Sequence, residues 1–167
     1  AEAASYFEKA AKLGNIYAQS TLASLYSIGQ GIEKDREKSF YWEKQAAEKG
    51  HLDSVKRVAY SYYKGYGIAK NFKHAITWHQ KAIDMGDSES IFDLAYMYEK
   101  GEGVDEDFDK ALELYIQSAE LGYDAAQNEL ADIYFKGRGV DKDYKKSLYW
   151  AQKSSDQGRS EEHTSEL

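Results

Sequence analysis

One short motif recurs along this chain at a constant spacing. It reads Tyr-x-x-Gly-x-Gly followed by Ile or Val, and each copy begins 36 residues after the previous one, at Tyr26, Tyr62, Tyr98 and Tyr134. A fixed period in this range is typical of a solenoid, in which each unit buries its apolar face against its neighbours in the sequence. The motif therefore predicts a repeat protein instead of a domain with one central core.

The period divides most of the chain into units. Four full repeats cover residues 15–50, 51–86, 87–122 and 123–158. The preceding residues 1–14 fall in the same phase as the end of a repeat, so we expect them to be the second half of a truncated one. The chain is thus predicted to contain an N-terminal half repeat followed by four complete repeats.

Each repeat carries two helical patterns. In the first half, apolar or small residues recur at i, i+4, i+5 and i+8 and so share one helix face, as do Ala18, Leu22, Ala23 and Tyr26. The first glycine of the motif is expected to end this helix, called helix A, in a left-handed conformation. A capping residue then begins helix B, at Asp35, Asn71, Asp107 and Asp143. A further glycine is expected to end it, at Gly50, Gly86, Gly122 and Gly158. Stacking of such antiparallel pairs makes an all-α solenoid.

The last nine residues do not follow the repeat. Residues 159–167 read RSEEHTSEL and resemble the translated start of a widely used sequencing adapter. We interpret them as a non-native tail. The last helix B is then expected to present Leu148 and Trp150 toward a neighbouring repeat that is absent.

The aligned repeats resemble a known family. Their pattern A-x-x-x-L-A-x-x-Y-x-x-G-x-G-V-x-x-D-(FY)-x-K-A-x-x-W-x-x-K-A-A-x-x-G is similar to the Sel1-like repeat, of the tetratricopeptide-like superfamily, over residues 1–158. Leu114 and Arg36 depart from it, replacing an aromatic residue in the third and first repeats. The resemblance implies a right-handed superhelix of helix pairs that serves as an adaptor in protein assemblies. Some bacterial members carry paired cysteines, and because this chain has none, the secreted cysteine-rich subgroup is disfavoured.

Charge and hydropathy exclude two classes of partner. Residues 51–86 hold six basic and two acidic residues, whereas residues 87–122 hold two basic and eleven acidic ones. This alternation argues against a continuous phosphate-binding groove, so we predict no nucleic acid. No run of 18 apolar residues is present, so we predict no membrane insertion. Nothing in the sequence assigns a cellular compartment.

No arrangement of residues typical of catalysis or metal binding is found. His51, His74 and His79 fall at different repeat phases, and we interpret them as surface histidines. The acidic stretch from Asp105 begins like a calcium loop, but Lys110 stands where such a loop needs glycine. We therefore predict no catalytic residue, no cofactor and no metal site, and a protein that is not an enzyme.

A second stripe on helix A is the candidate binding face. It lies opposite the core stripe at repeat positions 3, 6, 10, 13 and 14, and by analogy with tetratricopeptide arrays we expect it to line a concave groove. These positions vary between repeats and combine aromatic rings with charges, which is typical of protein or peptide contacts. In the first repeat they hold Tyr17, Ser20, Ser24, Ser27 and Ile28. The residues predicted to bind a partner are Lys56, Tyr60, Tyr63, Lys64, Phe92, Tyr96, Glu99, Lys100, Asp132, Phe135 and Lys136.

The sequence supports one leading function and two alternatives. The leading hypothesis is a scaffold that holds a protein or peptide segment in the groove of A helices, as a monomeric fragment of a longer repeat array. A carbohydrate or cell-wall binding module is the first alternative, because tyrosine rings also suit sugar faces. The second is a purely structural segment of a longer array whose binding residues lie in other repeats. For each aromatic ring of the stripe taken singly, the alternative is that it only fills a gap between adjacent A helices.

Overall fold

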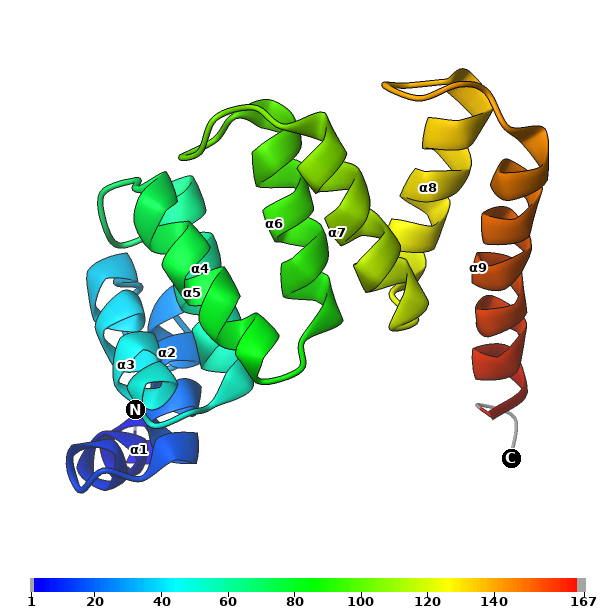
Figure 1. Cartoon of the computed structure of the whole chain (residues 1–167). Helices are drawn as coiled ribbons and strands as arrows, with labels where there is room; N and C mark the ends of the chain where they lie inside the picture. Colours follow the sequence, from blue (N-terminus) through cyan, green and yellow to red (C-terminus); the bar gives the residue numbers. More distant parts are fainter. Residues whose placement is uncertain (1, 165–167) are drawn as a thin grey trace. The chain divides into compact units, whose positions relative to one another are not determined.

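The computed structural model describes the backbone of residues 2–164 and the side chains of residues 4–157. Every regular element in this part of the chain is an α-helix (Figure 1). In order they are α1 (Glu2–Lys12), α2 (Ile16–Ile28), α3 (Arg36–Glu48), α4 (Leu52–Lys64), α5 (Phe72–Asp84), α6 (Ser88–Lys100), α7 (Phe108–Glu120), α8 (Asp124–Lys136) and α9 (Tyr144–Thr164).

The helices form two compact units, one holding α1 to α5 and the other α6 to α9. In the first unit, α2 packs with α3 and α4 with α5, and the two pairs meet through α3 and α4. In the second unit, α6 packs with α7 and α8 with α9, and these pairs meet through α7 and α8. Successive helices of a pair run in opposite directions (Figure 1). The even-numbered helices are therefore the predicted A helices and the odd-numbered ones the B helices.

The helix ends are set by the local residues that the sequence indicated. Asp35 begins α3 by accepting a hydrogen bond from the Lys38 backbone N–H at 2.9 Å, and three equivalent residues cap the later B helices, namely Asn71, Asp107 and Asp143. Gly29 ends α2 with a φ of 79°, and the other A helices end in the same way. The prediction for Gly158 is wrong, because α9 continues to Thr164. Glycine inside a helix costs only about 1 kcal/mol relative to alanine, so the following residues extend the helix through it.

The second glycine of the motif has a role beyond turning the chain. Gly67 has a φ of 71°, and a Cβ there would collide with the backbone carbonyl of Arg36 at the start of α3. Gly139 has a φ of 68°, and a Cβ there would collide with the ring of Phe108 at the start of α7. The loop of one repeat thus lies directly against helix B of the preceding repeat, which only glycine permits.

The residues of helix B that pack in the core are of two kinds: some pack within their own repeat and others pack against the next repeat. Trp42 packs against Leu22 and Tyr26 of its own helix A, whereas Phe40 packs with Val55 and Val58 of the next repeat. In α9 the tryptophan position is Trp150, which is only 8% exposed, so the expectation that it faces an absent neighbour is wrong. Leu148 holds the Phe40 position and is 69% exposed, as expected for that residue.

Candidate functional site

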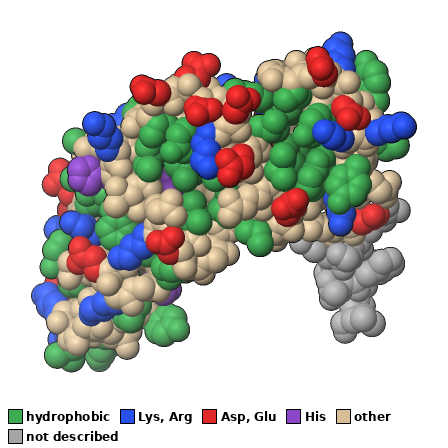
Figure 2. Space-filling view, in the orientation of Figure 1, with side chains coloured by type: hydrophobic (Ala, Val, Ile, Leu, Met, Phe, Trp, Pro, Cys, Tyr) green, Lys and Arg blue, Asp and Glu red, His purple; other side chains and the backbone are tan. Residues whose placement is uncertain are grey.

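The residues predicted to bind a partner lie on three A helices. In the first unit they belong to α4, and in the second to α6 and α8. Hydrophobic side chains reach the surface among charged ones on the face seen in the space-filling view (Figure 2).

On α4, one tyrosine is open and the other is packed. Tyr60 is 50% exposed, whereas Tyr63 is half-buried with its ring centroid 5.5 Å from that of Phe72. The Lys64 Nζ lies 4.8 Å from the Tyr63 ring centroid and 5.9 Å from that of Tyr60. Lys56 is half-buried. Helix α4 therefore presents an aromatic surface with a cation beside it.

On α6 and α8 the same pattern recurs with some of the charges already paired. Tyr96 is 40% exposed, and the Lys100 Nζ lies 5.4 Å from its ring centroid. Phe135 is 57% exposed and meets Tyr144 edge-on at 5.7 Å between centroids. The Asp132 carboxylate forms an ion pair with Lys136 at 2.8 Å.

Two of the predicted residues are engaged inside the second unit. Phe92 is half-buried and packs against Tyr115 and Tyr123 at centroid distances of 5.3 and 5.5 Å. Glu99 accepts hydrogen bonds from Lys100 and from the Tyr115 hydroxyl, both at 2.8 Å. Both residues fill space between helices, and a role for them in partner binding stays a prediction.

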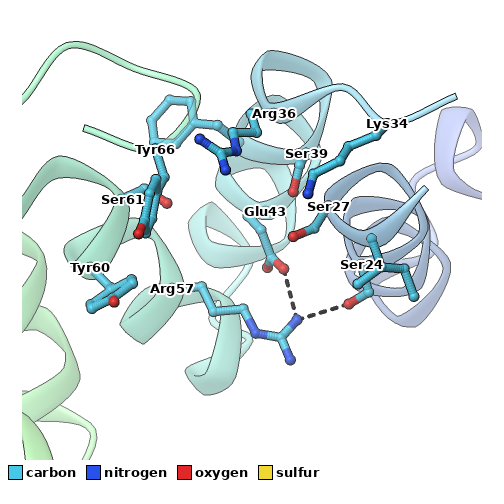
Figure 3. A pocket seen from close by; sticks show the side chains of 12 residues that line it. Ser24, Ser27, Lys34, Arg36, Ser39, Glu43, Arg57, Tyr60, Ser61 and Tyr66 are labelled. Atoms are coloured by element: carbon cyan, nitrogen blue, oxygen red, sulfur yellow. Dashed lines mark hydrogen bonds and ion pairs between the residues drawn. The ribbon is translucent and has the colours of Figure 1, made fainter. Parts of the chain in front are cut away.

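The first unit also contains a pocket that the sequence did not indicate. Its volume is about 410 Å³, and it opens between α2 and α4 with α3 behind it (Figure 3). Three of its residues belong to the predicted stripe of the first repeat, and Tyr60 belongs to the predicted binding set. The full lining is Ser24, Ser27, Ile28, Lys34, Arg36, Ser39, Phe40, Glu43, Arg57, Tyr60, Ser61 and Tyr66.

An ion pair lies in the middle of this pocket. Glu43 of α3 is only 4% exposed. Its Oε1 accepts a hydrogen bond at 2.8 Å from the Nη1 of Arg57 in α4, and the same nitrogen donates to the Ser24 hydroxyl of α2 at 3.0 Å (Figure 3). The other carboxylate oxygen, Oε2, is buried and has no hydrogen-bond partner. This ion pair joins α3 and α4 and leaves one acceptor unsatisfied.

Cations surround the pocket. The Arg36 guanidinium stacks over the Tyr66 ring at 5.1 Å, and Lys34 extends from the turn before α3 toward the same space (Figure 3). With Arg57, the lining holds three basic residues against the one acid, Glu43. Electrostatics therefore favour an anionic group in this pocket.

One sequence signal could have indicated the pocket. Glu43 holds a helix-B position that is occupied by His79, Tyr115 and Ala151 in the other repeats. Glu43, His79 and Tyr115 are all buried. A polar residue that varies between repeats at a buried position indicates a repeat-specific interaction.

One of the three histidines differs from the prediction, whereas His74 is exposed as expected. His79 is buried in α5, so its interpretation as a surface residue is wrong. His51 caps α4, with its Nδ1 accepting from the Ser54 backbone N–H at 3.3 Å. Within the described residues, no three His, Asp or Glu side chains are grouped so as to hold a metal ion. No helix in the same part of the chain is long and apolar enough to cross a bilayer.

Comparison with known proteins identifies the repeats. A family model described as the Sel1 repeat matches residues 1–15, 16–51, 53–87, 88–123 and 124–158. A comparison with curated proteins gave no match.

Solved structures with the same fold include Sel1 repeat proteins. The chain is 35% identical to a Sel1 repeat protein from Oxalobacter formigenes, with a TM-score of 0.86, covering 92% of this chain and 63% of that one. It is 33% identical to a protective antigen present in uropathogenic Escherichia coli strains that displays an SLR fold, with a TM-score of 0.80, covering 96% of this chain and 34% of the other. The Helicobacter pylori cysteine rich protein B is 25% identical, with a TM-score of 0.54, covering 75% of this chain and 90% of that one. The chain thus spans less than two thirds of the length of the first two proteins.

These findings confirm the predicted all-α solenoid of helix pairs. Sel1 repeat proteins are generally protein–protein interaction modules, and they are typically non-enzymatic scaffolds. With five matched segments covering most of its length, the chain belongs to the Sel1 repeat family.

Proposed function

We propose that this chain is an interaction scaffold whose A helices, in each unit, bind a protein or peptide segment through their exposed faces. The observation that carries the proposal is the exposure of Tyr60 and Tyr96, which hold the same position in α4 and α6. Each is followed one helical turn later by a lysine whose ammonium lies beside the ring, Lys64 and Lys100.

This arrangement suits recognition of a polypeptide. A tyrosine ring offers a rigid apolar surface with a polar hydroxyl, and such residues dominate the binding energy of many interfaces. Lys64 has no carboxylate partner in the described part of the chain, so it remains available for an acidic group of a partner. An aromatic anchor and a cation on one helix face therefore provide both affinity and orientation.

The test is selection of binding peptides by the intact chain. Peptides from a random displayed library are selected on the unmodified protein, and their affinities are then measured for the double variant Tyr60→Ser/Tyr96→Ser. We expect at least a tenfold loss of affinity with unchanged helical content. The matched control is Tyr41→Ser, because Tyr41 is 54% exposed but lies on helix α3, away from the predicted stripe.

The other outcomes separate the alternatives. Equal affinities for the double variant and the parent would refute binding through this surface. A chain that selects no peptide but binds immobilised glycans, with loss of binding in the double variant, would identify a carbohydrate-binding module. A chain that binds neither class of ligand would act as a structural segment of a longer array.

A further inference from the structure

The pocket between α2 and α4 has an excess of positive charge that the side chains of residues 4–157 do not neutralise. Glu43 is paired with Arg57, so the single acid in the lining is already engaged. Lys34 and Arg36 form no ion pair with any described residue. Two cations are therefore left at the pocket without a counter-charge among the described residues.

The two arginines of the pocket, Arg36 and Arg57, contact neighbouring side chains. Stacking on Tyr66 restricts the Arg36 guanidinium, which lowers the entropy lost when it binds a ligand. Arg57 uses only Nη1 for its bonds to Glu43 and Ser24, so its remaining N–H groups have no partner within the described residues. Arginine donors in this fixed geometry match a carboxylate, which accepts two parallel hydrogen bonds.

The rest of the lining suits a short apolar stem. Ile28, Phe40 and Tyr60 supply apolar surface, and serine hydroxyls lie between them. A volume of about 410 Å³ is at the lower end of the range for ligand pockets, enough for one side chain with its neighbouring backbone. An aspartate or glutamate side chain has this combination of a charged end and a short aliphatic stem.

We propose that this pocket receives the carboxylate of an acidic side chain from the polypeptide segment that lies on the A helices. The inference rests on the proposed function, since Tyr60 lines the pocket and also belongs to the exposed surface of α4. That continuity favours a side chain of a passing segment over the end of a chain.

The experiment follows the arginine side chains directly by NMR. The intact chain is titrated with a nine-residue peptide, acetylated and amidated at its ends, that carries three glutamates around one tyrosine. Three further probes are the same peptide with glutamine in place of glutamate, the glutamine peptide with a free C-terminal carboxylate, and inorganic phosphate. The Nε–H resonances of Arg36 and Arg57 report on the pocket, and the ring resonances of Tyr60 report on the surface.

The expected result is a saturable shift of the Arg36 and Arg57 resonances with the glutamate peptide alone. Arg36→Gln should lower the affinity for that peptide about tenfold or more, because one charge-assisted interaction is lost. The matched control is Lys73→Gln, which removes a charge from the exposed first turn of α5 and should change the affinity less than twofold. Affinity for the glutamine peptide should be the same in all three proteins.

Several results would overturn the proposal. Equal shifts with phosphate would assign the pocket to small anions, and equal shifts with the free C-terminal carboxylate would assign it to a chain end. Shifts of Tyr60 with both amidated peptides, without shifts of Arg36, would reject the pocket while leaving the scaffold function intact. Shifts of Arg36 that survive Tyr60→Ser unchanged would instead reject the α4 surface, and no shift at millimolar peptide would reject the acidic ligand.

Discussion

The spaces between repeats 1 and 2 and between repeats 3 and 4 are built from the same repeat positions, but their side chains differ. In the first unit, Glu43 of α3 pairs with Arg57 of α4, and the facing residue of α2 is the short Ser27. Because Ser27 does not reach across, a pocket remains between the helices (Figure 3).

In the second unit, the same positions hold larger side chains that bond to one another. Tyr115 replaces Glu43 and Glu99 replaces Ser27, and the Tyr115 hydroxyl donates to Glu99 at 2.8 Å. Arg138 adds an ion pair with Glu129 and lies 3.8 Å from the Glu99 carboxylate. This network fills the space in the second unit that is equivalent to the pocket of the first.

In the second unit, the contacts of Tyr115 and Glu99 shift the pKa of both groups. Burial raises the pKa of the Tyr115 phenol, and its hydrogen bond to Glu99 raises it further. Burial, the largest single cause, raises the pKa of Glu99, but the hydrogen bonds from Lys100 and Tyr115 and the positive charges of Arg138 and Lys100 together lower it more. The pKa therefore lies below its ordinary value. The same repeat backbone therefore accommodates either a hydrogen-bonded network or an open pocket. The residues at two variable positions, Ser27 or Glu99 and Glu43 or Tyr115, decide between them.

The largest expected loss of stability comes from replacing the second glycine of the repeat motif, where the loop of one repeat meets helix B of the preceding repeat. Gly67→Ala should destabilise the chain by about 3 kcal/mol, because the new methyl group meets the backbone of Arg36 at a positive φ. Gly139→Ala should cost less, since the ring of Phe108 can move more readily than a backbone carbonyl. Urea unfolding followed by circular dichroism measures both, and equal losses would contradict the contact argument.

Next in size is the effect of removing the Tyr115 hydroxyl. Tyr115→Phe should lower the free energy of unfolding by about 1 to 2 kcal/mol, because Glu99 loses a buried hydrogen-bond donor. Tyr149→Phe is the control, since Tyr149 is exposed on α9 and should change stability by less than about 0.5 kcal/mol. A midpoint shift in urea of the same size for both variants would show that the hydrogen bond contributes nothing.

A smaller effect is expected in how the free energy of unfolding depends on pH through Glu99. The pKa of Glu99 is lowered in the folded state, so its stabilisation is present above its ordinary value of 4.5 and is lost as the pH falls through the folded pKa. Glu99→Gln should therefore reduce stability at pH 6 more than at pH 3. Urea midpoints at the two pH values provide the measurement, and a loss that is larger at pH 3 would reverse the assigned sign.

The smallest expected change in stability comes from giving the first unit the residues that fill the space in the second. The double variant Ser27→Glu/Glu43→Tyr introduces the residues of the second unit into the first, and we expect its free energy of unfolding to change by less than about 1 kcal/mol. The new side chains should occupy the pocket and abolish the response of Arg36 to the glutamate peptide. A variant that still binds this peptide with parental affinity would show that the open volume is not required.

Much of the fold could be predicted because its signals are local. Asp35 caps α3 by accepting from a backbone N–H three residues further along the chain, and Gly29 ends α2 through its own backbone conformation. The exposed rings of Tyr60 and Tyr96 also follow from helical periodicity alone. The half-buried placement of Phe92 could not be predicted in this way, because its ring packs against Tyr115 of α7 and against Tyr123, the residue before α8.

The sequence by itself determined the repeat, the helix pairs and the apolar stripes, since these depend on neighbours within a few residues along the chain. Only the tertiary structure decided which polar residues meet. Glu43 reaches Arg57 across 14 residues, and Tyr115 reaches Glu99 across 16, each between different helices. The variable residues at these positions indicate that the repeats differ. Only the tertiary structure shows that the space at Ser27 is open and the one at Glu99 is filled, because such pairings depend on how two helices pack.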